Sequence, residues 1–331
     1  MEIATTEHIA IADSSSIGEA RRRGLHMAEK LGFDEARSGE FALLITEASR
    51  NVLVHAQTGH AILMGVKNSR GSFARILALD SGPGISDVTR AMNDGFSTAG
   101  SMGAGLGAMK RLAEALEVFT NPKGTIVLLE VRSAAAEKGP QIAGMAVPYP
   151  GERLCGDGWA YHRGQDRSVV LLVDGLGHGR LAAEAADEAI AIFHREVERT
   201  PGEILSCVHD GLKKTRGAVA AVAEIHSGEK VVTYAGVGNT AASLLNNHSS
   251  RSLVSHSGTL GVASPRIQEF RVEWPADGVF VMHSDGLTSR WDLSTYSGLL
   301  SRHAAIIGGV LFRDYRRQRD DASVVVVKAA A

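Results

Sequence analysis

Four aspartates in the second half of the sequence stand at the ends of apolar, strand-like runs. They are Asp157, Asp174, Asp285 and Asp320, and glycine lies beside most of them. Carboxylates gathered at one end of a sheet repel one another unless divalent cations neutralise them, and Mg²⁺ and Mn²⁺ prefer oxygen ligands. For any single Asp-Gly pair, the alternative is a tight turn between strands. Together the four predict a two-metal site that lowers the pKa of a bound water and supplies hydroxide for attack on phosphorus.

A second set of residues, in the first half, has the chemistry of a nucleotide pocket. Glu47 and Asn51 lie four apart on a predicted helix, so both side chains leave the same face. There the asparagine carbonyl can ligate Mg²⁺, and the glutamate can orient or deprotonate a hydroxyl. Asp80 ends an apolar run, where its carboxylate can accept a hydrogen bond from an adenine amino group. These three side chains therefore predict a site for ATP and Mg²⁺.

Glycines complete the predicted pocket in two groups. The first group follows Asp80 and lets the backbone approach a base closely, and the second precedes a predicted helix and can cradle phosphates with its amides. The glycines are Gly82 and Gly84, then Gly103, Gly105 and Gly107. A Gly-Pro-Gly turn and a solvated Glu/Asn pair are common alternatives when each piece is taken singly. The sequence contains no P-loop motif, and the second glycine group lacks the Rossmann spacing.

Length and composition favour two ordinary globular domains. The chain has 331 residues, 44% of them hydrophobic, and a formal net charge of -2. A chain of this length exceeds the usual size of a single core, and its charge gives no general attraction to nucleic acid. Two arginine clusters, Arg21 to Arg23 and Arg313 to Arg319, are interpreted as solvated helix faces, with docking of an acidic partner as the alternative.

The sequence also predicts a cytoplasmic location. Its first residues lack the basic leader and apolar core of a signal peptide, and no apolar stretch reaches the length that spans a bilayer. The two cysteines, Cys155 and Cys207, match no zinc or disulfide framework. We therefore expect a soluble protein that does not bind a membrane.

In the first half, apolar periodicity predicts an α+β domain with helices on one face of a mixed sheet. Helices are expected at 17–31, 34–56 and 106–116, and strands at 61–67, 73–79 and 125–131. Residues 133–140 have no apolar periodicity and end in Gly-Pro, so we expect a linker there. The predicted domains are therefore 1–132 and 141–331.

In the second half, many short strands and a pair of adjacent helices predict two packed sheets flanked by helices, an αββα sandwich. Strands are expected at 141–147, 168–173, 218–225, 230–237, 278–283 and 323–328. Helices are expected at 180–199, 201–215 and 294–311. This order disfavours a doubly wound parallel sheet.

Residues 5–131 resemble the GHKL (Bergerat) ATP-binding domain, and more narrowly the RsbT-type serine kinases of bacterial partner switching. The motifs that carry the resemblance are Glu47 to Asn51, Asp80 to Ile85, Asp94 to Thr98 and Gly103 to Leu112. The resemblance implies that Asn51 holds Mg²⁺, Glu47 is the catalytic base, Asp80 reads adenine and Thr125 supports the adenine pocket. It also implies a STAS-domain partner, of the anti-anti-sigma or stressosome type, and so a link to a sigma-factor regulator.

Residues 140–328 resemble the metal-dependent PPM phosphatases, especially the SpoIIE/RsbX group. The matching segments are Gly156-Asp157, Asp174 to Gly179, Tyr234 to Asn239, Gly258 to Gly261, Ser284 to Leu287 and Asp320 to Ser323. The resemblance implies that Asp157, Asp174, the carbonyl of Gly175, Asp285 and Asp320 bind the metals. Asp321 is a weaker candidate, and the role of Arg153 stays open. His178 is expected to shape the backbone of the glycine-rich turn.

Three hypotheses for function follow from these features. The first is an enzyme with two opposed activities, ATP-dependent phosphorylation of a serine or threonine and metal-dependent removal of that phosphate. In the second, the first domain only senses ATP and regulates the attached phosphatase, which leaves Glu47 without a task. The third treats both domains as inactive scaffolds, and the intact set of acidic residues argues against it.

Overall fold

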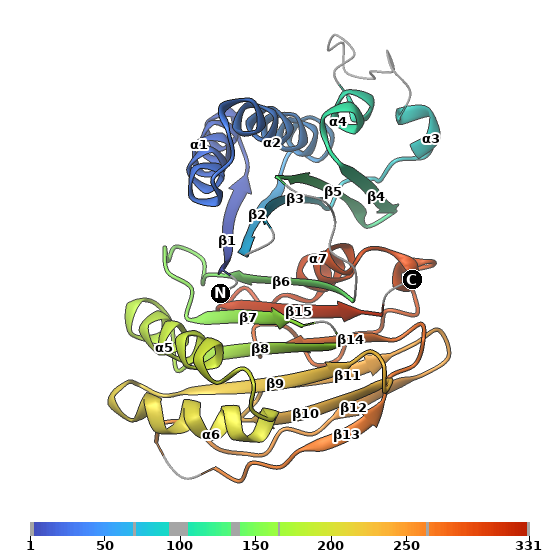
Figure 1. Cartoon of the computed structure of the whole chain (residues 1–331). Helices are drawn as coiled ribbons and strands as arrows, with labels where there is room; N and C mark the ends of the chain where they lie inside the picture. The colour runs from blue at the N-terminus through green and yellow to red at the C-terminus, as the bar shows by residue number, and fades with distance from the viewer. Residues whose placement is uncertain are drawn as a thin grey trace. The chain divides into compact units, whose positions relative to one another are not determined.

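The computed structural model describes residues 3–68, 71–92, 105–133, 140–164, 166–262 and 265–329 (Figure 1). The chain divides into two compact units, Met1–Ala136 and Glu137–Ala331. Gly103, the segment 94–98 and residues 134–139 of the predicted linker lie outside the described residues. Among the described helices, none combines the length and the apolar character that crossing a membrane requires.

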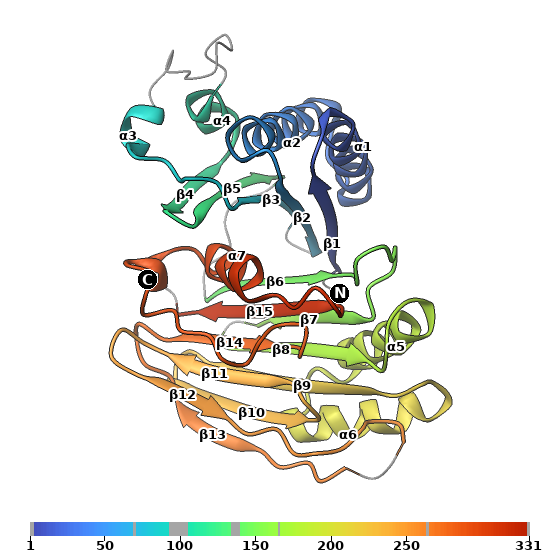
Figure 2. The ribbon, with the colours of Figure 1, turned by 180° about the vertical axis from the view of Figure 1, so that it is seen from behind.

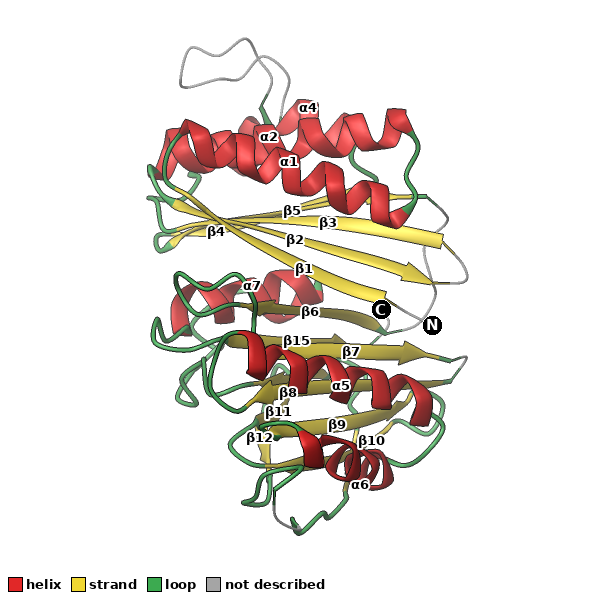
Figure 3. Cartoon of the chain, turned by 90° about the vertical axis from the view of Figure 1, so that its left-hand side faces the viewer, coloured by secondary structure: helices red, strands yellow, loops and turns green. Residues whose placement is uncertain are grey.

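The first unit is a five-stranded sheet in the order β1-β2-β3-β5-β4. Helices α1, α2 and α4 lie on one face of this sheet (Figure 3). The elements are β1 (Ile3–Ile11), α1 (Ser14–Leu31), α2 (Glu35–Ala56), β2 (Gly59–Asn68), β3 (Gly71–Asp80), α3 (Val88–Ala91), α4 (Leu106–Leu112), β4 (Ala115–Asn121) and β5 (Gly124–Arg132). The predicted α+β class with helices on one face is therefore confirmed.

The prediction of a mixed sheet in this unit is wrong, because every pair of neighbouring strands in the described sheet is antiparallel. Two consecutive helices connect β1 to β2. The first helix runs back along the sheet and the second returns to the edge at which β1 ends, so β2 runs antiparallel to β1. β2 and β3, and likewise β4 and β5, follow one another directly and form hairpins. The predicted helix 106–116 ends at Leu112, because Ala115–Asn121 pairs with β5 as a strand.

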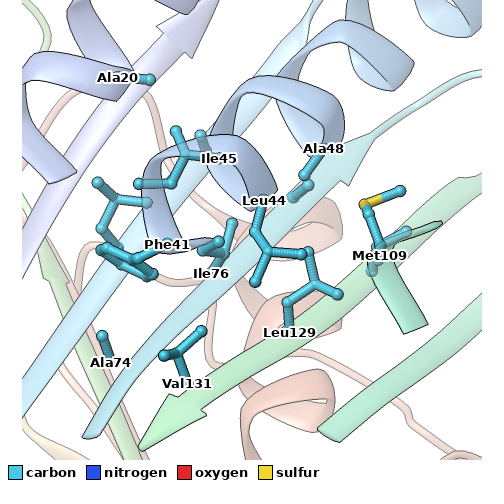
Figure 4. Packing of buried hydrophobic residues seen from close by; sticks show 14 of the residues in the cluster. Ala20, Phe41, Leu44, Ile45, Ala48, Ala74, Ile76, Met109, Leu129 and Val131 are labelled. Carbon is cyan, nitrogen blue, oxygen red and sulfur yellow. The ribbon is translucent and has the colours of Figure 1, made fainter. Parts of the chain in front are cut away.

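Helix α2 is held on the sheet by an apolar face (Figure 4). Phe41, Leu44, Ile45 and Ala48 recur at helical spacing and are fully or almost fully buried in one cluster with strand residues such as Leu129. Complete burial of a side chain the size of leucine or phenylalanine stabilises a fold by about 1.5–3 kcal/mol. This packing fixes the rotation of α2 and hence the direction in which Glu47 and Asn51 point.

The second unit consists of two five-stranded sheets, in the orders β13-β10-β9-β8-β7 and β12-β11-β14-β15-β6. Helices α5 and α6 cover the first sheet and α7 covers the second (Figure 2). The strands are β6 (Gln141–Val147), β7 (Asp157–Arg163), β8 (Arg167–Gly175), β9 (Ala218–His226), β10 (Val231–Val237), β11 (Ala241–Leu245), β12 (Ser250–Leu253), β13 (Phe270–Glu273), β14 (Val279–His283) and β15 (Ala322–Lys328). The helices are α5 (Arg180–Glu196), α6 (Pro201–Gly211) and α7 (Ala304–Tyr315), with short 3₁₀ turns at Leu212–Lys214 and Leu299–Ser301.

The predicted αββα sandwich is confirmed, with one displaced helix. The third helix begins at Ala304 instead of residue 294, and it extends to Tyr315. Its start is set by His303, whose Nδ1 accepts a hydrogen bond from the amide of Ala305 (3.0 Å). Such a cap satisfies one of the amides that every helix leaves unpaired at its first turn.

Candidate functional site

A cavity of about 400 Å³ in the first unit collects most of the predicted nucleotide residues. Six of them line it: Glu47, Asn51, Asp80, Gly84, Gly105 and Thr125. Glu47 and Asn51 reach it from α2, one helical turn apart. The others come from the end of β3 and the loop after it, from the start of β5 and from the residue before α4. Residues without a predicted role also line it, among them Arg50, Ile85 and Asp87. A cavity of this size is in the range of small-molecule sites.

Asp80 is held in position by the backbone of two neighbouring segments. Its Oδ1 accepts hydrogen bonds from the amides of Gly82 (2.8 Å) and Thr125 (3.1 Å). Gly124 has a φ of 134°, and a Cβ at this position would overlap the carbonyl oxygen of Asp80. The glycine therefore allows β5 to approach the end of β3 closely enough to fix this carboxylate at the wall of the cavity.

Two predicted glycines do not line the cavity in the described part of the chain. Gly82 instead contributes its amide to Asp80, and Gly107 is buried inside the first turn of α4. Gly105 is the N-cap residue of α4. Because glycine has no side chain, it makes no side-chain capping bond. The sequence pattern identified the two glycine-containing segments, but it did not distinguish the glycines that line the cavity, Gly84 and Gly105, from those that shape the backbone beside it.

In the second unit, the first two predicted metal ligands lie side by side on neighbouring strands. Asp157 begins β7, and Asp174 is its directly opposite partner near the end of β8. The amide of Gly175 donates to the carbonyl of Gly156 (3.0 Å), which continues the pairing beyond the two aspartates. Directly opposite residues in antiparallel strands have Cβ atoms about 5 Å apart, so these two carboxylates are neighbours.

Burial and mutual repulsion disfavour the charged form of both carboxylates. Burial raises the pKa of Asp157 to about 7, although hydrogen bonding from Ser284 opposes the change. Burial, with the charges of Asp157, Asp285 and Asp320, raises the pKa of Asp174 to about 9. Shifts of this size have the pattern expected of carboxylates that share one site without a neutralising cation.

Asp285 and Asp320 complete the electrostatic cluster. Burial raises the pKa of Asp285, and the charge of Asp320 raises it further. The side-chain amide of Asn239 donates to Asp285 Oδ2 (2.6 Å), which fixes the orientation of this carboxylate. Asn239 belongs to the segment Tyr234 to Asn239 of the phosphatase resemblance, but its contact with Asp285 could not be predicted from the sequence. Strand pairing thus places Asp157 opposite Asp174, and the charges of Asp285 and Asp320 act on Asp174.

Asp321 has a different environment from the four predicted ligands. Its Oδ1 accepts a hydrogen bond from the amide of Tyr149 (2.7 Å), and its Oδ2 accepts one from the amide of Gly156 (3.0 Å). Both oxygens are thus used to hold the segment between β6 and β7, and the residue is buried. This geometry indicates an anchor for the loop that leads to Asp157.

The loop anchored by Asp321 also meets the glycine-rich turn after Asp174. The ring of Tyr149 stacks on His178 with centroids 4.8 Å apart, and His178 Nδ1 lies 3.1 Å from Glu152 Oε1. Gly177 and Gly179, on either side of His178, have φ values of 80° and 74°. Arg153 is exposed on the same loop.

The donor set fits divalent cations. Asp157 Oδ2 is buried without a hydrogen-bond partner in the described structure, next to a second carboxylate whose charged form is disfavoured. No three carboxylate, imidazole or thiol side chains in the described ranges are arranged to hold one metal ion directly. Mg²⁺ usually keeps several waters and binds through one or two carboxylates, so a pair of these aspartates together with water is a donor set of the kind that it takes.

Comparison with known families assigns both units. Residues 164–330 match the family Stage II sporulation protein E (SpoIIE), and residues 11–131 match the histidine kinase-like ATPase domain. Asp157 lies just before the first of these matched ranges, whereas Asp174, Asp285 and Asp320 lie within it. The two resemblances seen in the sequence are confirmed.

Two proteins of Bacillus subtilis (strain 168) are similar to different parts of the chain. The serine/threonine-protein kinase RsbT is 36% identical over 106 residues, which cover 32% of this chain and 80% of RsbT. The phosphoserine phosphatase RsbX is 26% identical over 140 residues, which cover 41% of this chain and 69% of RsbX.

Solved structures give the same assignment of the fold. A chain from a study of the bacterial stressosome as a modular system that controls secondary messenger signalling aligns with a TM-score of 0.54 and 27% identity, covering 58% of this chain and 100% of that one. The structure of RsbX in complex with magnesium aligns with a TM-score of 0.54 and 19% identity, covering 65% of this chain and 100% of RsbX. The second likeness concerns the fold alone.

Proposed function

The chain belongs to the SpoIIE family through its second unit and shares the family of RsbT through its first, and we propose on this premise that it is a partner-switching signalling enzyme with two opposed activities. The second unit is proposed to remove phosphate from a phosphoserine or phosphothreonine with Mn²⁺ or Mg²⁺. The first unit is proposed to transfer phosphate from ATP to a serine or threonine. A single docked protein would then meet both sites at a raised local concentration.

The phosphatase proposal depends most on one observation, the unpartnered buried oxygen of Asp157 beside Asp174. In this proposal Asp157, Asp174, the carbonyl of Gly175, Asp285 and Asp320 hold the cations. When bound, divalent cations lower the pKa of a water and supply hydroxide for in-line attack on phosphorus. The chain itself supplies the negative charge that attracts them, the hydrogen bond from Asn239 that orients Asp285, and the anchor at Asp321 that positions the loop before Asp157.

The phosphatase half is tested with a phosphoserine protein as substrate and Mn²⁺ as the metal. We expect release of phosphate by the intact protein and none by Asp174→Asn, because this substitution removes one of two facing carboxylates. Asp166→Asn is a matched control, since Asp166 is exposed on the same unit. Equal rates for Asp174→Asn and the intact protein would refute the proposed site.

The kinase half is supported by the shared cavity of Glu47, Asn51 and Asp80. Asn51 is proposed to hold Mg²⁺ on ATP, Glu47 to act as the base toward the accepting hydroxyl, and Asp80 to bind the adenine amino group. Gly84, Gly105 and Thr125 line the same cavity and are proposed to shape it around the nucleotide. Incubation with labelled ATP and a STAS-domain protein should label that protein, and Asn51→Ala should abolish the label.

The competing function for the first unit is an ATP-sensing binding module that regulates the attached phosphatase. Binding of ATP by the intact protein without any transfer to a STAS-domain protein would favour it. The presence of Glu47 in the cavity argues for transfer, because a binding module needs no base. The STAS-domain partner is proposed from the similarity to RsbT and to the stressosome chain.

A further inference from the structure

Large apolar side chains that remain exposed in the second unit gather around the proposed metal site. Among the described residues of this unit, five such side chains are exposed, and three of them lie within seven positions of Asp157 or Asp174: Leu154 (49% exposed), Leu176 (38%) and Leu181 (48%). Of the other two, Val262 (66%) is brought to the site by the contacts described below, and Val254 (58%) is not part of the group. Leu154 is three residues before Asp157, and Leu176 is two residues after Asp174. Exposed apolar side chains of this size are unremarkable when scattered, but a group around one site indicates a binding surface.

Contacts of the backbone bring Leu176 and Val262 together, although they are far apart in sequence. The amide of Leu176 donates to the carbonyl of Gly217 (3.1 Å). A Cβ placed on Gly217 would lie 3.0 Å from Cγ2 of Val262. Gly217 is therefore in contact with both segments, and Val262 lies beside the turn that follows Asp174.

Leu154 and Leu181 approach the same turn through Gly156 and Ala182. A Cβ on Gly156 would lie 2.7 Å from Cβ of Ala182 and 3.2 Å from the carbonyl oxygen of Gly177. Leu154 precedes Gly156 by two residues, and Leu181 is the neighbour of Ala182 in the first turn of α5. The stacked pair of Tyr149 and His178 adds aromatic surface at this position.

We propose that these side chains form a docking surface, here called the apolar rim and defined as Leu154, Leu176, Leu181 and Val262, for the segment that flanks the phosphoserine of a protein substrate. The proposal rests on the proposed phosphatase function and specifies its substrate class, a phosphoserine with apolar neighbours. A phosphate held at the metal residues places the adjoining residues of its own chain over Leu154 and Leu176, which lie three and two positions from Asp157 and Asp174. A small phosphate ester has no atoms to cover these side chains.

The test compares three substrates with the intact protein in Mn²⁺ and without ATP. They are para-nitrophenyl phosphate and two phosphoserine peptides of equal length and charge, one with leucine and valine around the phosphoserine and one with serine and glycine. We expect the apolar peptide to have the higher kcat/KM. Hydrolysis of neither para-nitrophenyl phosphate nor a peptide would refute the phosphatase proposal itself, whereas equal kcat/KM for the two peptides would overturn only the apolar rim.

Single substitutions then locate the surface. Leu181→Ser and Val262→Ser should each lower the ratio of kcat/KM for the apolar peptide to that for para-nitrophenyl phosphate by about fivefold, because docking would cover only the exposed half or so of each aliphatic side chain. Leu43→Ser is the matched control, because Leu43 lies on a helix of the first unit and is also 48% exposed. An unchanged ratio in both variants would overturn the proposal. If the intact protein forms a dimer in light scattering and the variants do not, without a change in the ratio, the proposal would also be overturned, because the rim would then be a contact with a second copy of the chain.

Discussion

Substitution of Asp174 by asparagine is expected to stabilise the metal-free protein while abolishing its phosphatase activity. Burial, with the charges of Asp157, Asp285 and Asp320, raises the pKa of Asp174 from 3.8 to about 9. A carboxyl group with a higher pKa in the folded chain takes up a proton on folding, so its contribution to stability falls as pH rises between the two pKa values. At pH 7 the penalty is at most about 4 kcal/mol, since each pH unit above the unfolded pKa costs about 1.4 kcal/mol.

Asparagine carries no charge and has nearly the same shape, so Asp174→Asn removes this penalty. The gain should be near zero at pH 4, should grow toward pH 9 and should be smaller than the ceiling because Asp157 shares the same repulsion. Excess Mn²⁺ should reverse the order of stabilities, because a ligand that binds only the folded state stabilises it. The carboxylates of the intact protein bind the cation, and the variant has lost one of them.

The assay is urea unfolding in EDTA and in Mn²⁺, followed by tryptophan fluorescence. All three tryptophans, Trp159, Trp274 and Trp291, belong to the second unit, so the signal reports that unit alone. Asp166→Asn makes the same change at an exposed position and should have little effect in either condition. If Asp174→Asn is less stable than the intact protein in EDTA at pH 7, the reasoning about repulsion at the site is refuted.

Three further predictions concern residues outside the proposed metal ligands. Glu130→Gln should destabilise the first unit by about 3–5 kcal/mol in urea unfolding, because Arg75 and Arg132 would lose the buried carboxylate that both contact. Burial raises the pKa of Glu130, but the two arginines lower it more, so its net pKa is below the usual value. The stability that Glu130 contributes should therefore be lost as pH falls below about 4. An unchanged midpoint of acid unfolding in Glu130→Gln would contradict this. Asp321→Ala should lower kcat for phosphoserine hydrolysis and lower the thermal midpoint of unfolding. The amides of Tyr149 and Gly156 lose their hydrogen-bond acceptors, and each unsatisfied amide costs about 1–3 kcal/mol of stability. Loss of Mn²⁺ binding with an unchanged thermal midpoint would indicate a ligand instead of an anchor. Gly124→Ala should weaken binding of a non-hydrolysable ATP analogue in calorimetry, because its Cβ would overlap the carbonyl of Asp80, and unchanged affinity would show that Asp80 needs no such close approach.

Much of the fold follows from local sequence patterns, and the exceptions share a cause. The predicted strand 141–147 coincides with β6, and the helix predicted at 34–56 is nearly the observed α2, because an apolar periodicity runs through each. The predicted helix 106–116 includes the first two residues of β4, since the residues near Leu116 suit either structure and only pairing with β5 decides between them. β11 and β12 pair with each other as a hairpin of only five and four residues, and three of the four residues of β12 are exposed, so these strands carry little apolar signal.

The candidate sites show the same division between local and long-range information. Residue type and adjacency to glycine were enough to single out Asp157 and Asp174, whose opposite positions on β7 and β8 the structure then shows. The role of Asp321 could not be predicted, because it depends on amides more than 160 positions away in the chain. Asn239 and Asp285 are likewise brought together only by the sheet.

The central claim, that the aspartates of the second unit converge on paired cations, is tested most directly by counting bound Mn²⁺. A titration of the metal-free protein, followed by electron paramagnetic resonance without ATP, should show two Mn²⁺ per chain with the spin coupling of neighbouring ions. Asp174→Asn should lose that coupling, while Asp166→Asn should retain it. Absence of bound Mn²⁺ in the intact protein, or the same coupled signal in Asp174→Asn, would contradict the claim.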